Sequence, residues 1–179
     1  MHCSNQHTKG LTLIELLVTV SILGILIAIA TPNLYHFYAN QRLAVLTQQF
    51  THTLSLARSN AIRHNSTVVL CPVNSSSQCT QEKDWQRRWI IFNDVNHNSQ
   101  HDDGEVLFKK LHFDDHPVNI TSNRKRPPTF YHHGKSPGSN ATFLFCDERG
   151  GEYAKAVILS NSGRFRIVSK KSDGSALKC

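Results

Sequence analysis

The stretch KGLTLIELLV, residues 9–18, opens an apolar run that continues to Ala30 and decides the fold of this chain. A membrane-spanning helix needs about 20 mostly apolar residues, and the run from Leu11 to Ala30 has that length. A cleaved secretory signal is the alternative, but Thr-Pro-Asn at residues 31–33 interrupts the small-residue pattern of a cleavage site. The sequence therefore predicts a membrane helix that stays with the mature chain.

Two charges near the run indicate a function and an orientation. Glu15 is a carboxylate in apolar surroundings, which costs several kcal/mol without a partner, so a functional role is predicted. A charge tolerated at the membrane surface is the alternative. Lys9 precedes the run, and positive residues favour the cytoplasmic side, so everything after Ala30 is expected outside the cytoplasm.

At these residues the chain resembles the type IV prepilin family. The family signal is a short basic leader, a Gly, a hydrophobic first mature residue and a Glu five positions after the cut, and Gly10, Leu11 and Glu15 match it. The resemblance implies that a prepilin peptidase cleaves after Gly10 and methylates Leu11, and that Glu15 meets the new amine of a neighbouring pilin subunit. It also implies a single-pass inner-membrane protein with a periplasmic domain, assembled into a cell-surface pilus.

A second apolar pattern follows the membrane segment, with steps of four, three and four residues, as on one face of an amphipathic helix. Its members are Phe50, Leu54, Ala57 and Ala61. Pro32 can kink a helix without ending it. One long helix is therefore predicted from Leu11 to about Arg63, ended by Asn65 and Ser66, with its second half packed on a sheet.

Short apolar and β-branched runs, separated by Gly, Pro, Asn and Ser clusters, predict strands in the rest of the chain. The predicted strands are residues 67–71, 89–92, 106–113, 117–121, 129–132, 142–146, 154–160 and 164–168. The fold class is α+β. The expected parts are a leader at 1–10, a transmembrane or filament-core helix at 11–32, an amphipathic helix at 33–64 and one β-rich globular domain at 65–179.

The order of these parts resembles the GspH/FimT branch of minor pilins. The matching segments are residues 56–62, 69–72, Trp85, 89–92, 94–96, 146–150 and 160–167. The resemblance implies the type IV pilin fold, in which the long N-terminal helix packs on an antiparallel C-terminal sheet. It also indicates a FimT-like member of the branch.

Four cysteines remain once the leader with Cys3 is removed, and an even number in an oxidising compartment predicts two disulfides. The eight-residue spacing of Cys71 and Cys79 suits a local closure, which leaves Cys146 to pair with Cys179. A zinc site is the rival interpretation, but it needs more closely paired ligands.

The net charge of +7 is concentrated in the C-terminal third. Residues 149–179 carry seven basic and two acidic residues, and residues 121–140 carry four basic residues and no acid. Such a charge favours an acidic partner, either nucleic acid or an anionic surface. The alternative is that these charges lie on strand edges and discourage aggregation.

The sequence Gly-Arg-Phe-Arg-Ile carries the strongest candidate site. Gly163 suits a turn with positive φ, and the residues after it alternate as in a half-buried strand. Arg164 and Arg166 would then share one face about 7 Å apart, which suits neighbouring phosphates. Phe165 and Ile167 would anchor the strand to the core.

FimT-like pilins with a Gly-Arg-x-Arg segment are associated with DNA capture in natural transformation, so the resemblance implies binding of extracellular double-stranded DNA. The predicted DNA-binding residues are Gly163, Arg164, Arg166, Lys170, Lys171, Arg149 and Lys155. No base-reading motif accompanies them, so phosphate contacts without sequence preference are expected. The alternative is a structural minor pseudopilin of a type II secretion system, or a pilus-assembly subunit that binds no DNA.

Oxygen side chains between Asp94 and Glu105 follow the spacing of an EF-hand loop, but Ser99 replaces the required Gly and the flanks read as strands. A polar hairpin loop is therefore predicted. The histidines follow no metal-binding pattern, and no nucleophile elbow, phosphate-cradling loop or dinucleotide fingerprint occurs. The sequence predicts no metal, no cofactor and no enzyme activity.

Overall fold

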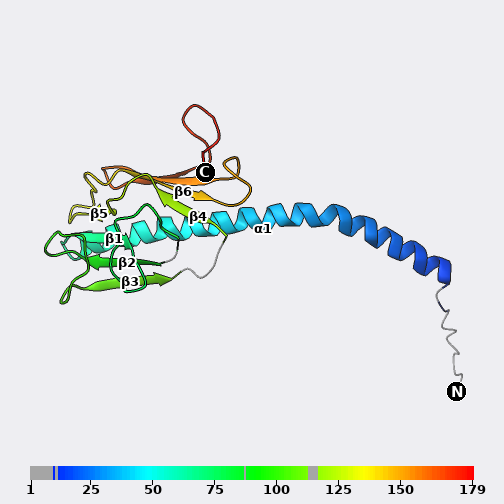
Figure 1. Ribbon diagram of the computed structural model, residues 1–179, viewed down its shortest axis with the longest axis horizontal. Helices are drawn as coiled ribbons and strands as arrows, with labels where there is room; N and C mark the ends of the chain where they lie inside the picture. The colour runs from blue at the N-terminus through cyan, green and yellow to red at the C-terminus, as the bar shows by residue number, and fades with distance from the viewer. Residues whose placement is uncertain (1–9, 11, 87, 113–116) are drawn as a thin grey trace, which may run out of the picture. The chain divides into compact units, whose positions relative to one another are not determined.

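The computed structural model describes residues 10, 12–86, 88–112 and 117–179, in two compact units that divide after Ala39. One helix, α1 (Leu13–Arg63), runs through Pro32 without a break, as predicted (Figure 1). In the first unit its large apolar side chains are exposed. Among the described residues, α1 is the one helix long and apolar enough to cross a membrane.

The end of α1 is fixed by hydrogen bonds from Asn65 and Ser66 to carbonyls of its last turn. Asn65 has a φ of 48°, in the left-handed region that Asn tolerates. The amide of Asn65 donates to the Ile62 carbonyl at 3.3 Å, and the amide of Ser66 donates to the Ala61 carbonyl at 3.1 Å. This pair of bonds is a Schellman motif, which satisfies carbonyls that a helix end would otherwise leave without partners. The predicted stop at Asn65 and Ser66 is confirmed.

The described residues of the second unit, Asn40–Cys179, form two four-stranded sheets in which every strand pair is antiparallel. The first has the order β3-β2-β1-β5, formed by β3 (Leu107–His112), β2 (Arg88–Asn93), β1 (Val68–Pro72) and β5 (Thr129–Phe130). The second has the order β4-β6-β7-β8, formed by β4 (Asn119–Ser122), β6 (Ala141–Cys146), β7 (Lys155–Leu159) and β8 (Phe165–Val168). A strand lies within or across each predicted range, which confirms the α+β class.

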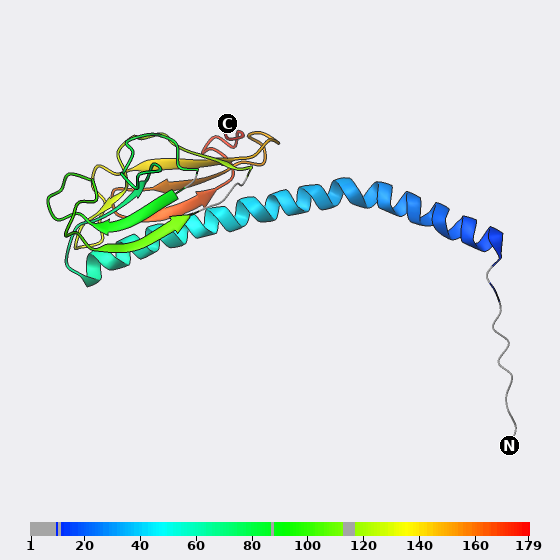
Figure 2. The ribbon, with the colours of Figure 1, turned by 60° about the horizontal axis from the view of Figure 1, so that its bottom comes forward.

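The C-terminal part of α1 lies along both sheets (Figures 1 and 2). Phe50 occupies the centre of this contact and is fully buried. Its ring lies 5.0 Å from that of Trp89 on β2, and 4.6 and 5.5 Å from those of Phe143 and Phe145 on β6. Such aromatic contacts add about 0.5–1.5 kcal/mol each beyond burial. One helix side chain therefore joins the two sheets into a common core.

The rest of the predicted apolar face of α1 is buried in the same core, because Leu54, Ala57 and Ala61 are all inaccessible to solvent. The residues of this face recur along the chain at the period of an α-helix, so all of them face the sheets. The prediction that the second half of α1 is amphipathic and packs on a sheet is thus confirmed.

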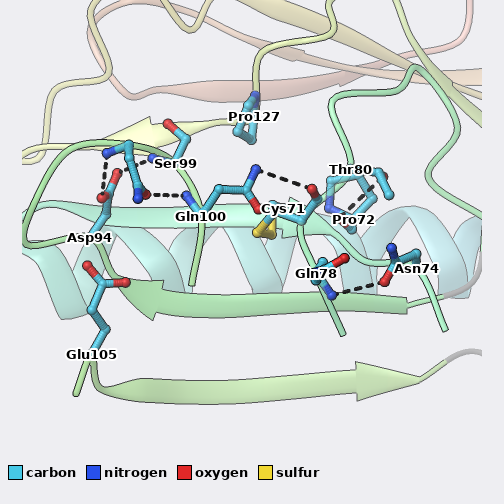
Figure 3. Close-up of a disulfide and its surroundings, with 12 residues drawn as sticks. Cys71, Pro72, Asn74, Gln78, Thr80, Asp94, Ser99, Gln100, Glu105 and Pro127 are labelled. Carbon is cyan, nitrogen blue, oxygen red and sulfur yellow. Dashed lines mark hydrogen bonds between the residues drawn. A yellow bond between two sulfur atoms is a disulfide. The ribbon is translucent and has the colours of Figure 1, made fainter. Parts of the chain in front are cut away.

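Two disulfides close loops within the second unit. Cys71 on β1 is bonded to Cys79, and Cys146 at the end of β6 is bonded to Cys179. This is the pairing expected from the spacing. Figure 3 shows the first of them between β1 and the segment that follows it.

Candidate nucleic-acid interface

The predicted Gly-Arg-Phe-Arg segment begins in the tight turn between β7 and β8. The amide of Gly163 donates to the Ser160 carbonyl at 2.9 Å, and the amide of Ser160 donates to the Arg164 carbonyl at 2.9 Å. Gly163 has the expected positive φ, at 76°, and a Cβ there would lie 2.1 Å from the Gly134 carbonyl oxygen. Glycine is therefore required twice, by the backbone conformation and by the close approach of another loop.

Strand β8 presents Arg166 on the outer face of the second sheet. Arg166 lies opposite Ile158 in the antiparallel register, and directly paired residues share a face. Phe165 is half-buried against the core, as predicted. Ile167 is 47% exposed, so the prediction that it anchors the strand is wrong. The reason is that β8 is the edge strand of its sheet, and no described strand pairs with its outer edge.

A groove of about 700 Å³ crosses this outer face. Its floor is apolar and comes from three adjacent strands, through Leu144, Ala156, Ile158 and Val168. Residues 121–123 line it on the β4 side, and the C-terminal tail after β8 supplies further lining residues. Its cationic side chains are Arg166, Lys170, Lys171 and Lys178. We call this feature, with these four cations, the basic groove.

The tail, which contains a small hairpin, contributes three of the four cations. Its strands meet at a bridge between Lys170 and Ala176, and the amide of Lys171 donates to the Ser175 carbonyl at 3.0 Å. Asp173 in the hairpin turn accepts bonds from the Ser175 side chain and backbone, which lower the pKa of the Asp173 carboxyl. The disulfide to Cys146 then holds the far end of the tail against the sheet.

The sequence analysis predicted that Arg149 and Lys155 bind DNA together with these cations, but the structure places both residues outside the groove. The Arg149 guanidinium is buried, bonded to Asp147 at 2.6 Å and to the Asn40 side chain at 2.9 Å, and stacked on the Tyr153 ring. Lys155 is half-buried and pairs with Phe145, so it lies on the core-facing side of the sheet. Neither residue lines the basic groove.

Arg164 is exposed at the turn, next to the basic groove but outside its lining. It lies two residues before Arg166 on the same hairpin, where an extended chain advances about 7 Å. Of the seven predicted DNA-binding residues, Arg166, Lys170 and Lys171 thus come together in the groove, with Gly163 and Arg164 in the adjoining turn. Lys178, which the sequence analysis left out of this set, joins them because the disulfide returns the tail to the sheet.

A second candidate feature is the start of α1. Gly10 is exposed before the helix, and Leu11 lies outside the described residues. The amide of Glu15 donates to the Thr12 hydroxyl at 3.3 Å, and the amide of Thr12 donates to the Glu15 carboxylate at 3.4 Å. This reciprocal pair is a capping box, whose Thr-x-x-Glu signature is present in the sequence but was missed. Glu15 therefore has a partner within its own chain.

The loop from Asp94 to Glu105 joins β2 to β3, which confirms the predicted hairpin loop. The Asp94 carboxylate accepts backbone bonds from residues 98 and 99, at 3.1 and 3.0 Å. Gln100 donates to the Cys79 carbonyl at 3.3 Å, which ties the loop to the first disulfide (Figure 3). In the described part of the chain, no three His, Cys, Asp or Glu residues are placed to hold a metal ion.

Two aspartates of this loop have opposite pKa shifts. Burial raises the pKa of the Asp94 carboxyl, more than its backbone hydrogen bonds lower it. The amide side chains of Asn96 and Asn98 donate to Asp102 at 2.8 and 2.7 Å, and these bonds lower the pKa of that exposed carboxyl. Both carboxylates accept hydrogen bonds from other residues of this loop.

Comparison with known proteins places the chain in a family. The model of the family described as type II transport protein GspH matches residues 46–163, and that of the prokaryotic N-terminal methylation motif matches residues 5–31. The pilin-like protein PilA1 of Thermus thermophilus is 30% identical over 175 residues, which cover 89% of this chain and 97% of that protein. The chain belongs to the GspH/FimT family of type IV minor pilins.

The fold of this minor pilin is similar to that of the type IV minor pilin FimU of Pseudomonas aeruginosa. Two crystal structures of FimU match with TM-scores of 0.58 and 0.55, both at 18% identity. They cover 78% and 75% of this minor pilin and 96% of FimU. The type IV pilin fold predicted from the sequence is confirmed. As a structural pilin, this chain assembles with other pilin subunits, with its apolar N-terminal helix as the membrane anchor.

The GspH match ends at residue 163. Arg164, Arg166 and the whole cationic tail of this minor pilin therefore lie beyond the matched residues. Whatever these side chains bind must be inferred from the basic groove itself.

Proposed function

We propose that this minor pilin binds extracellular double-stranded DNA without sequence preference, for uptake in natural transformation. The observation that carries the proposal is the basic groove, where Arg166, Lys170, Lys171 and Lys178 converge and none of the lining residues is acidic. Four cations around one groove repel each other unless an anion enters, so a polyanion is the ligand that this arrangement favours.

The chemistry of the groove favours contact with a duplex backbone over contact with bases. Guanidinium and ammonium groups bind phosphate oxygens through charge-assisted hydrogen bonds, which carry no sequence information. Single-strand sites usually stack bases on aromatic side chains, and none of the residues that line this groove is aromatic. The groove is also exposed to solvent, so its phosphate contacts weaken as salt rises.

A binding titration of the full chain in nonionic detergent tests the proposal. Two unrelated duplexes at two salt concentrations are expected to bind equally and more weakly at higher salt. Arg164→Gln with Arg166→Gln should weaken binding about tenfold or more, and lower the slope of log affinity against log salt by about 1.8, because each phosphate contact contributes about 0.9.

A charge-matched control is available on the other sheet. Lys109 and Lys110 are exposed on β3, so Lys109→Gln with Lys110→Gln removes the same charge away from the groove. This control is expected to retain most of the affinity. Equal losses in the two double variants would show that net charge, and not the basic groove, holds the DNA, and that would contradict the proposal.

The family match supports one other candidate function, that of a structural subunit of a type II secretion system. In that case the groove would contact an acidic neighbouring subunit. Deletion of the gene distinguishes the two, because a secretion defect with normal transformation would favour the structural role.

Processing and orientation belong to the same proposal. The N-terminal methylation motif spans Gly10, Leu11 and Glu15, and supports cleavage after Gly10 by a prepilin peptidase and methylation of Leu11. The second unit would then lie in the periplasm, anchored in the inner membrane by α1. During assembly, Glu15 would exchange its bond to Thr12 for the amine of a neighbouring subunit. Mass spectrometry of the mature N-terminus checks the cleavage and the methyl group.

A further inference from the structure

Three loops meet at the end of the second sheet where β8 begins: residues 123–126, 134–140 and 160–164. The amide of Ser136 donates to the Asn161 carbonyl at 3.0 Å, and the amide of Asn140 donates to the Asn161 side chain at 3.3 Å. The close approach of Gly163 to Gly134 adds a backbone contact between the same two loops. These segments, far apart in the chain, therefore form one surface.

Besides Arg164, four cations lie on this surface outside the lining of the basic groove: Arg124, Lys125, Arg126 and Lys135. We call them the loop cluster. All four are exposed. Arg124 donates to the Gly138 carbonyl at 3.4 Å and to the Asn140 side chain at 3.3 Å, which holds the 123–126 loop beside the 134–140 loop.

The loops that carry this cluster bring no negative charge with them. Residues 121–140 and 160–164 contain no aspartate or glutamate. The interactions that hold the loops together are bonds to carbonyl and amide oxygens, which leave the positive charge in place. A concentrated charge of this kind is an electrostatic footprint for a polyanion.

The loop cluster continues directly from the basic groove. Asn123 lines the groove and is fixed to β6, because its amide donates to the Thr142 carbonyl at 3.1 Å and its side chain accepts from the Thr142 amide at 2.8 Å. Arg124 is the next residue along the chain. Arg164 is on the turn at 160–164, which is hydrogen-bonded to the 134–140 loop of the cluster, and it precedes Arg166 by two residues. The two groups of cations therefore form one continuous track.

The length of the basic groove indicates why a second group of cations matters. From Arg164, in the turn that adjoins the groove, to Lys170 the chain advances six residues, about 20 Å at 3.3 Å each. A duplex rises about 3.4 Å for each base pair, so this length matches only about six base pairs. A longer duplex extends past the groove, and at the turn end it meets the loop cluster.

We propose that the loop cluster is a second phosphate-binding site that extends the basic groove, so that a long duplex contacts both and a short one needs the groove alone. This inference rests on the proposed DNA binding. It adds residues 124–126 and 135 to the interface and predicts that affinity rises with duplex length beyond the span of the groove.

The test compares duplexes of about 6 and about 24 base pairs, bound by the full chain in detergent. Arg124→Gln with Lys125→Gln and Arg126→Gln is expected to weaken binding of the long duplex about tenfold or more, and to lower its salt slope by up to about 2.7, at about 0.9 for each lost phosphate contact. Binding of the short duplex should stay within about threefold of wild type.

The control removes three exposed cations of α1 and β3, away from the track, through Arg42→Gln, Lys109→Gln and Lys110→Gln. Equal behaviour of this control and the loop-cluster variant on the long duplex would overturn the inference while leaving the basic groove intact. Failure of the wild type to bind either duplex would overturn the proposed function itself. Lys125→Glu alone keeps the hydrogen bonds of Arg124. If the triple variant proves unstable, this single variant should weaken binding of the long duplex but not of the short one.

Discussion

The Cys146–Cys179 disulfide offers a quantitative test of how the tail is held. Replacing both cysteines with serine opens a loop of 33 residues. In the chain-entropy account, closing a loop of this length removes about 12.5 cal/mol/K from the unfolded state, which corresponds to about 3.7 kcal/mol at 25 °C. The free energy of unfolding of Cys146→Ser with Cys179→Ser is therefore expected to fall by about that amount.

The other disulfide is the internal standard. Cys71 and Cys79 close only eight residues, for which the same account gives about 2.5 kcal/mol. The ratio of the two losses in unfolding free energy is a firmer test than either loss alone, because strain in the folded state and residual structure in the unfolded state affect both losses. Urea unfolding followed by tryptophan fluorescence is a suitable assay, since Trp85 and Trp89 are both buried in the core and become exposed on unfolding.

Two results would refute this reasoning. A smaller loss for the long loop than for the short one would show that the loop length does not set the stabilisation. Unchanged hydrogen exchange at the tail amides, such as that of Lys171, would show that the hairpin holds its place without the covalent bond.

Two further predictions concern a turn and a loop. Gly163→Ala should lower the free energy of unfolding by about 2–3 kcal/mol, through positive φ and the clash with Gly134, whereas Gly174→Ala, at positive φ in open space, should cost about 1 kcal/mol in the same urea assay. In an NMR titration, Asp94 should titrate above and Asp102 below the usual aspartate range. Because its pKa is raised, the charged Asp94 carboxylate disfavours the folded state, and this effect is removed as the pH falls through that pKa. Because its pKa is lowered, the charged Asp102 carboxylate favours the folded state, and this contribution is lost as the pH falls through that pKa. Two unshifted aspartates would contradict this.

Local patterns were enough to predict most of the secondary structure. Alternating and β-branched runs located the strands, and Asn65 followed by Ser66 marked the helix end. The division into two sheets was not predicted, because pairing depends on contacts between distant segments. Strand β5 is shorter than its predicted range because the chain turns at Tyr131, where the Gly134 amide donates back to its carbonyl at 2.7 Å.

The candidate site was predicted in part, for similar reasons. Gly163 and Arg166 are local features of one hairpin, and the sequence identified them. Arg149 was misassigned because net charge does not reveal a partner, although Asp147 stands only two residues earlier. Lys178 was missed because its place in the groove depends on a disulfide that spans 33 residues.

The hairpin tail also has a mechanical property. Lys170, Lys171 and Lys178 lie between two attachments to the same sheet, the hydrogen bonds of β8 on one side and the covalent bond to Cys146 on the other. A tail held only by β8 would peel from the edge one backbone bond at a time when pulled. With both ends fixed, a pull on any of the three lysines is shared between β8 and the end of β6, so the sheet bears the load across strands and does not unzip along one.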